Sequence, residues 1–73
     1  MTSTTTRLRE ITVNGSTVAT ASDTVDALVA EQGFGGVKVA TAVNGDFVPE
    51  RRRADTALAV GDHVEILSVR QGG

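Results

Sequence analysis

Residues 61–73 read GDHVEILSVRQGG, a stretch that combines a strand pattern with a terminal pair of glycines. The first two residues predict a turn, and the alternation that follows predicts a β-strand. Val64 and Ile66 share one face of this strand, whereas Leu67 and Val69 take the opposite face. An element that covers one face of the sheet therefore leaves aliphatic side chains on the other, exposed to water unless a partner covers them.

The last four residues, Arg70–Gly73, continue beyond this strand. Glycine is costly to order and has no side chain to pack, so a terminal diglycine contributes nothing to a core. Four extended residues span about 13 Å at roughly 3.3 Å each, which suits a narrow enzyme channel. We therefore expect Arg70, Gln71 and Gly72 to thread the active site of a partner enzyme, with the Gly73 carboxylate at the tip.

The Gly73 carboxylate is the candidate reactive group. A carboxylate is a poor electrophile, but adenylation with ATP supplies a good leaving group, and a sulfur nucleophile can then displace AMP. The product is a C-terminal thiocarboxylate, so a chain without cysteine can still carry sulfur. We expect the chain itself to have no catalytic side chain, no bound cofactor and no metal.

The sequence upstream predicts one helix, over the letters ASDTVDALVAEQG of residues 21–33. Asp23 or Thr24 can cap its first turn through a side-chain oxygen. Gly33 provides the stop at its C-terminal end. The spacing of its apolar residues predicts one stripe that faces a core, formed by Val25, Leu28 and Val29.

Alternating patterns predict four strands in all, at residues 8–13, 16–20, 37–43 and 63–69. The pairs Asn14-Gly15 and Asn44-Gly45 each predict a tight turn. The stretch DFVPERRRADTAL at residues 46–58 is half polar and holds the only proline, so we expect it to be irregular.

The order strand, strand, helix, strand, strand predicts an α+β fold, with one mixed four-stranded sheet and the helix packed on one face. We expect residues 1–6 to be a disordered lead-in, residues 7–69 to be the folded domain and residues 70–73 to be a flexible diglycine tail.

Composition argues against several classes of function. The 73 residues make one domain, and the formal charge of −2 argues against a protein that binds nucleic acid. No apolar stretch approaches the roughly 20 residues that span a bilayer, and no secretory signal pattern opens the sequence. The absence of cysteine excludes disulfides and cysteine-bound metals, and we expect a cytoplasmic protein.

Three other groups are interpreted as structural. The run Arg51–Arg53 could contact phosphate or RNA, but it is short, lacks aromatic neighbours and belongs to an acidic chain, which favours a solvated loop. His63 has neither a partner nucleophile nor further metal ligands in the pattern. The segment Gly33–Gly36 lacks the lysine of a phosphate loop and follows a helix, which is typical of a connector.

A partner-docking patch is expected on the uncovered face of the sheet. Leu67 and Val69 lie there on the last strand, and Ala40 and Ala42 lie on the outward face of the strand at residues 37–43. Stray surface aliphatics or self-association would be the alternatives to a docking role.

Three motifs resemble those of a known family: VNGDFVPERR at Val43–Arg52, GDHVEI at Gly61–Ile66, and the terminal diglycine. Together with the order of the elements, they make residues 11–73 similar to the thiamine-biosynthesis sulfur carriers of bacteria, which are ubiquitin-like β-grasp proteins. The family often carries a tryptophan shortly after the Val-Pro pair, where this sequence has Arg52, Arg53 and Ala54.

The resemblance implies a pathway and a set of partners. It implies that the first and last strands are parallel neighbours, and that an E1-like adenylyltransferase uses ATP to activate Gly73. Sulfur would come from a donor such as a cysteine desulfurase, and the thiocarboxylate would deliver it to thiazole synthase. The tail, Arg70–Gly73, would enter the active sites of these partners, while the outer face of the sheet would provide the docking surface.

Other readings remain open at the level of sequence. The chain could carry sulfur for molybdopterin, cysteine or another metabolite, although molybdopterin carriers tend to have prolines before the tail, and this chain has none there. It could also be a ubiquitin-like modifier whose diglycine is joined to lysines, or a plain interaction domain that happens to end in two glycines.

Overall fold

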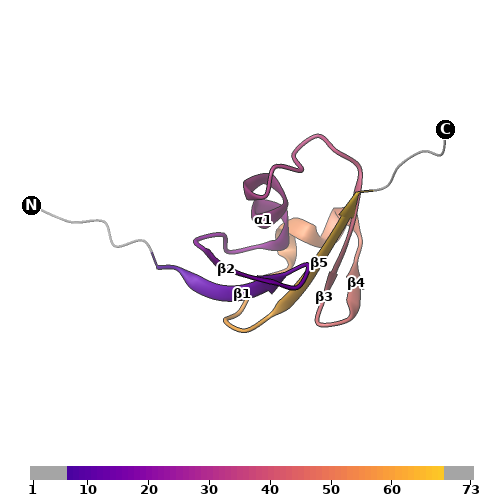
Figure 1. Cartoon of the computed structure of the whole chain (residues 1–73). Helices are drawn as coiled ribbons and strands as arrows, with labels where there is room; N and C mark the ends of the chain where they lie inside the picture. Colours follow the sequence, from indigo (N-terminus) through magenta and orange to yellow (C-terminus); the bar gives the residue numbers. More distant parts are fainter. Residues whose placement is uncertain (1–6, 69–73) are drawn as a thin grey trace, which may run out of the picture.

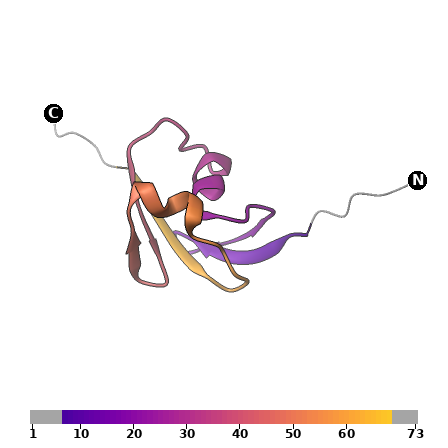
Figure 2. The ribbon, with the colours of Figure 1, turned by 180° about the vertical axis from the view of Figure 1, so that it is seen from behind.

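The computed structural model describes residues 7–68. Residues 1–6 and 69–73 fall outside it, and with them the predicted lead-in, the predicted tail and Val69 of the predicted patch. In the described part, a five-stranded sheet carries one α-helix and one 3₁₀ helix on the same face (Figure 1; Figure 2 shows the two helices from behind). No helix within residues 7–68 is long and apolar enough to cross a membrane.

The elements follow the predicted order, with two additions after the third strand. They are β1 (Arg9–Val13), β2 (Ser16–Thr20), α1 (Val25–Glu31), β3 (Val39–Val43), β4 (Asp46–Val48), η1 (Glu50–Asp55) and β5 (His63–Ser68).

The sheet has the strand order β2-β1-β5-β3-β4, so β5 lies in the middle (Figure 1). β1 and β5 run parallel, with Thr12 opposite His63, and the other neighbours are antiparallel. The mixed α+β sheet is therefore confirmed, as is the parallel pairing of the first and last strands. The number of strands is five rather than the predicted four.

The additional strand, β4, corrects part of the expectation for residues 46–58. Asn44 and Gly45 adopt φ angles of 51° and 87°, which suit a tight turn whose twist matches that of paired strands. The turn returns the chain along β3, where Phe47 lies opposite Ala42. Pro49 follows at once, and because proline has no N–H to donate, the strand ends after three residues.

Helix α1 is fixed at both ends by its own sequence. Thr24 is the N-cap, and its hydroxyl accepts a hydrogen bond from the Ala27 N–H at 3.2 Å. At the other end Gly33 has a φ of +88°, and its N–H donates to the carbonyl of Ala30. The N–H of Phe34 donates to the carbonyl of Val29, which completes the glycine-based helix stop that the sequence predicts.

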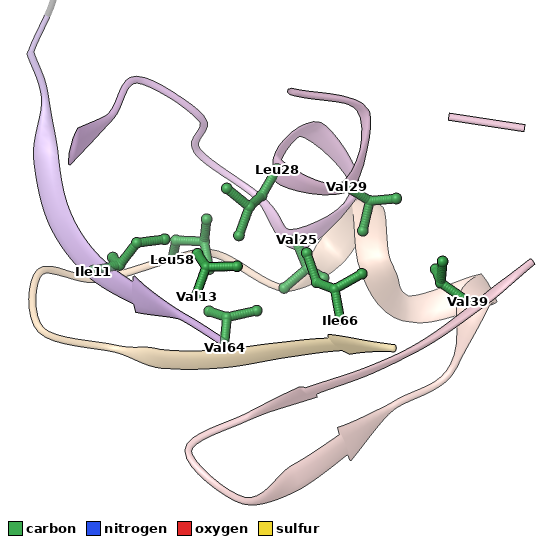
Figure 3. Packing of buried hydrophobic residues seen from close by; sticks show 9 residues of the cluster. All are labelled: Ile11, Val13, Val25, Leu28, Val29, Val39, Leu58, Val64 and Ile66. Atoms are coloured by element: carbon green, nitrogen blue, oxygen red, sulfur yellow. The ribbon is translucent and has the colours of Figure 1, made fainter. Parts of the chain in front are cut away.

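The core lies between the sheet and α1. Side chains from β1 and β5 point toward the three predicted helix residues (Figure 3). Since these groups are aliphatic and almost wholly buried, their removal from water supplies much of the stability of a domain this small. The cluster consists of Ile11, Val13, Val25, Leu28, Val29, Val39, Leu58, Val64 and Ile66.

The arginine run is only partly a solvated loop, contrary to the expectation. It forms the 3₁₀ helix η1, in which Arg51 and Arg52 are exposed. Arg53 is buried, with 9% of its surface exposed, and its guanidinium bonds to groups on β3. Of Arg52, Arg53 and Ala54, which fill the stretch where the resembled family often has tryptophan, Arg53 is the one that points inward.

Candidate functional site

The outer face of β5 is the first part of the candidate site. Along this strand Val64 and Ile66 face α1 and are 1% exposed, as predicted. Leu67 points the other way and is 61% exposed. The alternation follows from the pleat of the strand, in which successive side chains leave opposite faces.

Two alanines of β3 extend this face beside Leu67. Ala40 lies directly opposite Leu67 in the antiparallel register, and Ala42 lies opposite Glu65. Side chains in such directly opposed positions lie about 4.5–5.5 Å apart at their Cβ atoms. Ala40 and Ala42 are half-buried, and because their side chains are small, the side chain of Leu67 protrudes above them. The structure thus brings together the three predicted patch residues that lie within residues 7–68.

Phe47 is a fourth member of this surface, and it was missed in the sequence. It lies opposite Ala42 on β4, diagonal to Ala40, and 69% of its surface is exposed. The Asn44-Gly45 turn was the signal that could have found it, because a hairpin places the residue after the turn beside the strand before it. We call Ala40, Ala42, Phe47 and Leu67 the outer patch.

On β1 and β2 the outer face is mainly polar, although Ala19 lies there opposite Glu10. Glu10 and Thr12 of β1 share it with Thr17 of β2, because the alternate residues Ile11 and Val13 face the core. The two large exposed apolar side chains of the outer face, Phe47 and Leu67, therefore lie on the half of the sheet formed by β3, β4 and the end of β5, where Glu65 also lies opposite Ala42. An apolar area of this kind with a polar rim is typical of a protein-interaction site.

The end of β5, whose last described residue is Ser68, is held from both sides. On one side Ser68 is opposite Val39 of β3. On the other, the Asn14 side chain replaces a neighbouring strand. Its Nδ2 donates to the Ile66 carbonyl at 3.0 Å, and its Oδ1 accepts from the Ile66 N–H at 2.8 Å. The described end of β5 is therefore fixed directly beside Leu67.

The predicted tail, Arg70–Gly73, lies outside the described residues, so its threading role stays a prediction. The structural interpretations of two other groups agree with their positions. His63 opens β5 with an exposed side chain, and residues 33–36 connect α1 to the approach to β3. Among residues 7–68, no three histidine or acidic side chains gather closely enough to hold a metal ion.

The comparisons with known proteins agree with this architecture. A model of the ThiS family matches residues 5–73. The chain belongs to the ThiS family. Its fold is similar to the crystal structure of the thiamine biosynthesis protein ThiS from Geobacter metallireducens, with a TM-score of 0.72 and 25% identity. That match covers 88% of this chain and 99% of the Geobacter chain. A search among curated proteins found no match.

The family match confirms the resemblance drawn from the three motifs, and the structural match confirms the β-grasp fold class. In this ThiS-family chain, the residues that carry the resemblance occupy two kinds of position. Residues 43–52 run from the end of β3 through the turn and β4 into η1, whereas residues 61–66 form the turn before the central strand β5 and its first part.

Proposed function

We propose that this chain is the sulfur carrier of thiamine biosynthesis, which supplies sulfur for the thiazole ring. It acts as a co-substrate of partner enzymes and is not itself an enzyme. The observation that supports this most strongly is the outer patch. Its residue Leu67 lies near the end of β5, the strand that precedes the segment ending in Gly73. Membership of the ThiS family supports the pathway.

The chemistry takes place at the Gly73 carboxylate. An E1-like adenylyltransferase joins this carboxylate to the AMP part of ATP, and pyrophosphate leaves. Hydrosulfide then attacks the acyl carbon, AMP leaves, and the chain carries a thiocarboxylate. In the cell the sulfur comes from a donor such as a cysteine desulfurase. Thiazole synthase receives the sulfur, and the chain returns to a carboxylate.

The globular part contributes recognition. Each partner covers the outer patch while residues 70–73 reach its active site. Complete burial of an exposed leucine or phenylalanine side chain contributes about 1.5–3 kcal/mol, so Leu67 and Phe47 can together supply a large part of the docking free energy. The two alanines between them let a partner approach the backbone of β3 closely.

Intact-mass measurement tests the carrier role. The chain is incubated with the adenylyltransferase, ATP and sulfide, and we expect a mass gain equal to the replacement of one oxygen by sulfur, together with release of AMP. A chain that lacks Gly73 is the matched control and should show neither. If the full chain forms no AMP and keeps its mass, the carrier role is wrong.

The pathway is tested separately. The thiocarboxylate form is mixed with thiazole synthase and its other substrates, and thiazole phosphate should appear in proportion to the thiocarboxylate consumed. If the thiocarboxylate forms but no sulfur reaches thiazole synthase, the carrier role stands and the thiamine pathway is rejected in favour of another sulfur pathway.

The docking surface is tested with Leu67→Glu. We expect the affinity for the adenylyltransferase to fall about tenfold or more, because a charge then meets the apolar surface of the partner, while the thermal midpoint stays unchanged. The control is Val60→Glu, since Val60 is also exposed, at 74%, and precedes β5 at its opposite end. Equal losses from the two variants would contradict the assigned surface.

A further inference from the structure

Arg53 is a buried cation whose bonds all go to neutral groups. Its Nη2 donates to the Val39 carbonyl at 2.6 Å, and its Nε donates to the Thr41 hydroxyl at 3.2 Å. That hydroxyl donates in turn to the Val48 carbonyl at 2.7 Å. These bonds hold the guanidinium in one orientation against β3.

Arg53 has no counter-ion among the described residues. Within residues 7–68 the one ion pair joins Arg9 to Asp23, so no carboxylate lies within pairing distance of Arg53. Removing a cation from water costs several kcal/mol, and an opposite charge normally offsets that cost. A buried arginine without a carboxylate is thus a group that gains from an incoming anion.

The guanidinium also keeps unused donors that reach solvent. An arginine has five N–H donors, and within residues 7–68 no acceptor bonds to Nη1 of Arg53. No buried side-chain nitrogen or oxygen of the described part lacks a partner. It follows that Nη1 is not sealed in the interior and keeps contact with solvent.

Arg53 lines two surface hollows, and one of them adjoins the outer patch. That hollow has a volume of about 250 Å³, and its walls include Ala40 and Phe47, two members of the outer patch. The charged groups around it are Arg53, Lys38 and Glu50, so the hollow is positive by one unit. A second hollow of about 540 Å³ adjoins it, but there Asp26 and Glu50 balance the same two cations.

We propose that the hollow beside Phe47 receives the carboxylate of an aspartate or glutamate from the protein that docks on the outer patch, and that Arg53 pairs with it. This rests on the proposed carrier function. The hollow and the patch share two residues, so a partner that covers Ala40 and Phe47 also borders the hollow and can bring a carboxylate to it. A guanidinium already oriented by β3 loses little freedom when it binds, which favours a strong contact.

The test compares Arg53→Met with Arg52→Met, a change of the same charge at the exposed neighbour. Affinity for the adenylyltransferase is measured by calorimetry at low and high salt, with thermal midpoints for each variant. We expect Arg53→Met to weaken binding about tenfold or more at low salt and to flatten the salt dependence. Arg52→Met should keep both close to the starting values, and Arg53→Lys should keep the salt dependence but lose part of the affinity.

A measurement on the unaltered chain covers the case in which Arg53→Met fails to fold. In ¹⁵N-labelled protein the Nε–H signal of Arg53 should shift, and its exchange with water should slow, when the adenylyltransferase is added. The Arg52 signal should not change. If the Arg53 signal does not shift when the enzyme is added, the proposal is wrong. A shift with acetate, measured against chloride at equal ionic strength, but none with the enzyme would show that the hollow binds a free carboxylate, and the partner contact would be rejected.

The outcomes also separate this proposal from the carrier function. Should the enzyme bind the unaltered chain and lose affinity for Leu67→Glu but not for Arg53→Met, the docking face stands and the carboxylate contact is rejected. Should the enzyme not bind the unaltered chain, the carrier function itself is rejected.

Discussion

The two faces of β5 place similar side chains in opposite surroundings. Ile66 is 1% exposed beneath α1, and Leu67, the next residue, is 61% exposed on the outer face. The residue types differ little, so the burial of each is decided by what covers its side of the sheet. On the inner face aliphatic side chains hold the domain together, whereas on the outer face they are available for recognition. If the proposed docking role holds, stability and partner binding are carried by different residues of one strand.

The largest effect should separate these two faces directly. Ile66→Ala is expected to lower the free energy of unfolding by about 2–5 kcal/mol, because it leaves a cavity in the core. Leu67→Ala should change it by no more than about 0.5 kcal/mol. Urea unfolding followed by circular dichroism measures both. Comparable losses from the two variants would show that the outer face also contributes to the core.

The next effect concerns the two turn asparagines that flank β5. Asn14→Gly removes two part-buried bonds to Ile66, and we expect a loss of about 1–3 kcal/mol. Glycine accepts the positive φ of this position, so backbone strain does not contribute. Asn44→Gly is the matched variant. Its side chain bonds to Asp62 and His63 at exposed positions, and its loss should be smaller.

Hydrogen exchange sharpens the same comparison. The Ile66 amide should exchange faster in Asn14→Gly than in Asn44→Gly, because only the first variant removes its acceptor. An unchanged Ile66 amide would mean that the Asn14 side chain does not hold the end of β5.

A smaller effect is expected at the cap of the helix that covers the inner face. Thr24→Ala removes the acceptor of the Ala27 N–H and should cost about 1 kcal/mol in unfolding free energy. Thr24→Ser keeps the hydroxyl and should be close to neutral. A loss from Thr24→Ser as large as that from Thr24→Ala would assign the effect to the methyl group instead of the cap.

The smallest effect on stability should come from Phe47→Ser on the outer patch. An exposed side chain leaves no cavity, so we expect a change within about 0.5 kcal/mol. Affinity for the adenylyltransferase should nevertheless fall about tenfold. Val60→Ser, exposed but distant from the patch, should change neither quantity. A stability loss in Phe47→Ser would place part of the ring in contacts that hold β4.

Most of the fold could be predicted because local patterns agree with the tertiary structure. The alternation in residues 63–69, the helical stripe at Val25, Leu28 and Val29, and the two Asn-Gly turns each identify an element that is present in the described part. β4 was missed because three residues before a proline are too few to show alternation. The Asn44-Gly45 turn is the one local signal of β4, because a tight hairpin turn implies a returning strand.

The candidate site divides in the same way. Leu67, Ala40 and Ala42 could be assigned to one face because strand periodicity alone fixes the direction of each side chain. The outer position of Phe47 could not be assigned without knowing that β4 exists. The burial of Arg53 could not be assigned without knowing how η1 turns. A run of three arginines looks uniformly polar in sequence, and only the acceptors on β3, the Thr41 hydroxyl and the Val39 carbonyl, explain why the third one is buried.

The central place of β5 has a consequence for synthesis. Within the described sheet it alone joins the β1–β2 hairpin to the β3–β4 hairpin, and it is the last of the five strands to be translated. We therefore expect the two hairpins to stay apart, each with an unpaired edge, until β5 is available to pair with both. We expect nascent chains stalled with β5 still in the exit tunnel to be cleaved readily by protease, and chains stalled after its release to resist. Equal resistance at both lengths would mean that the hairpins associate without it.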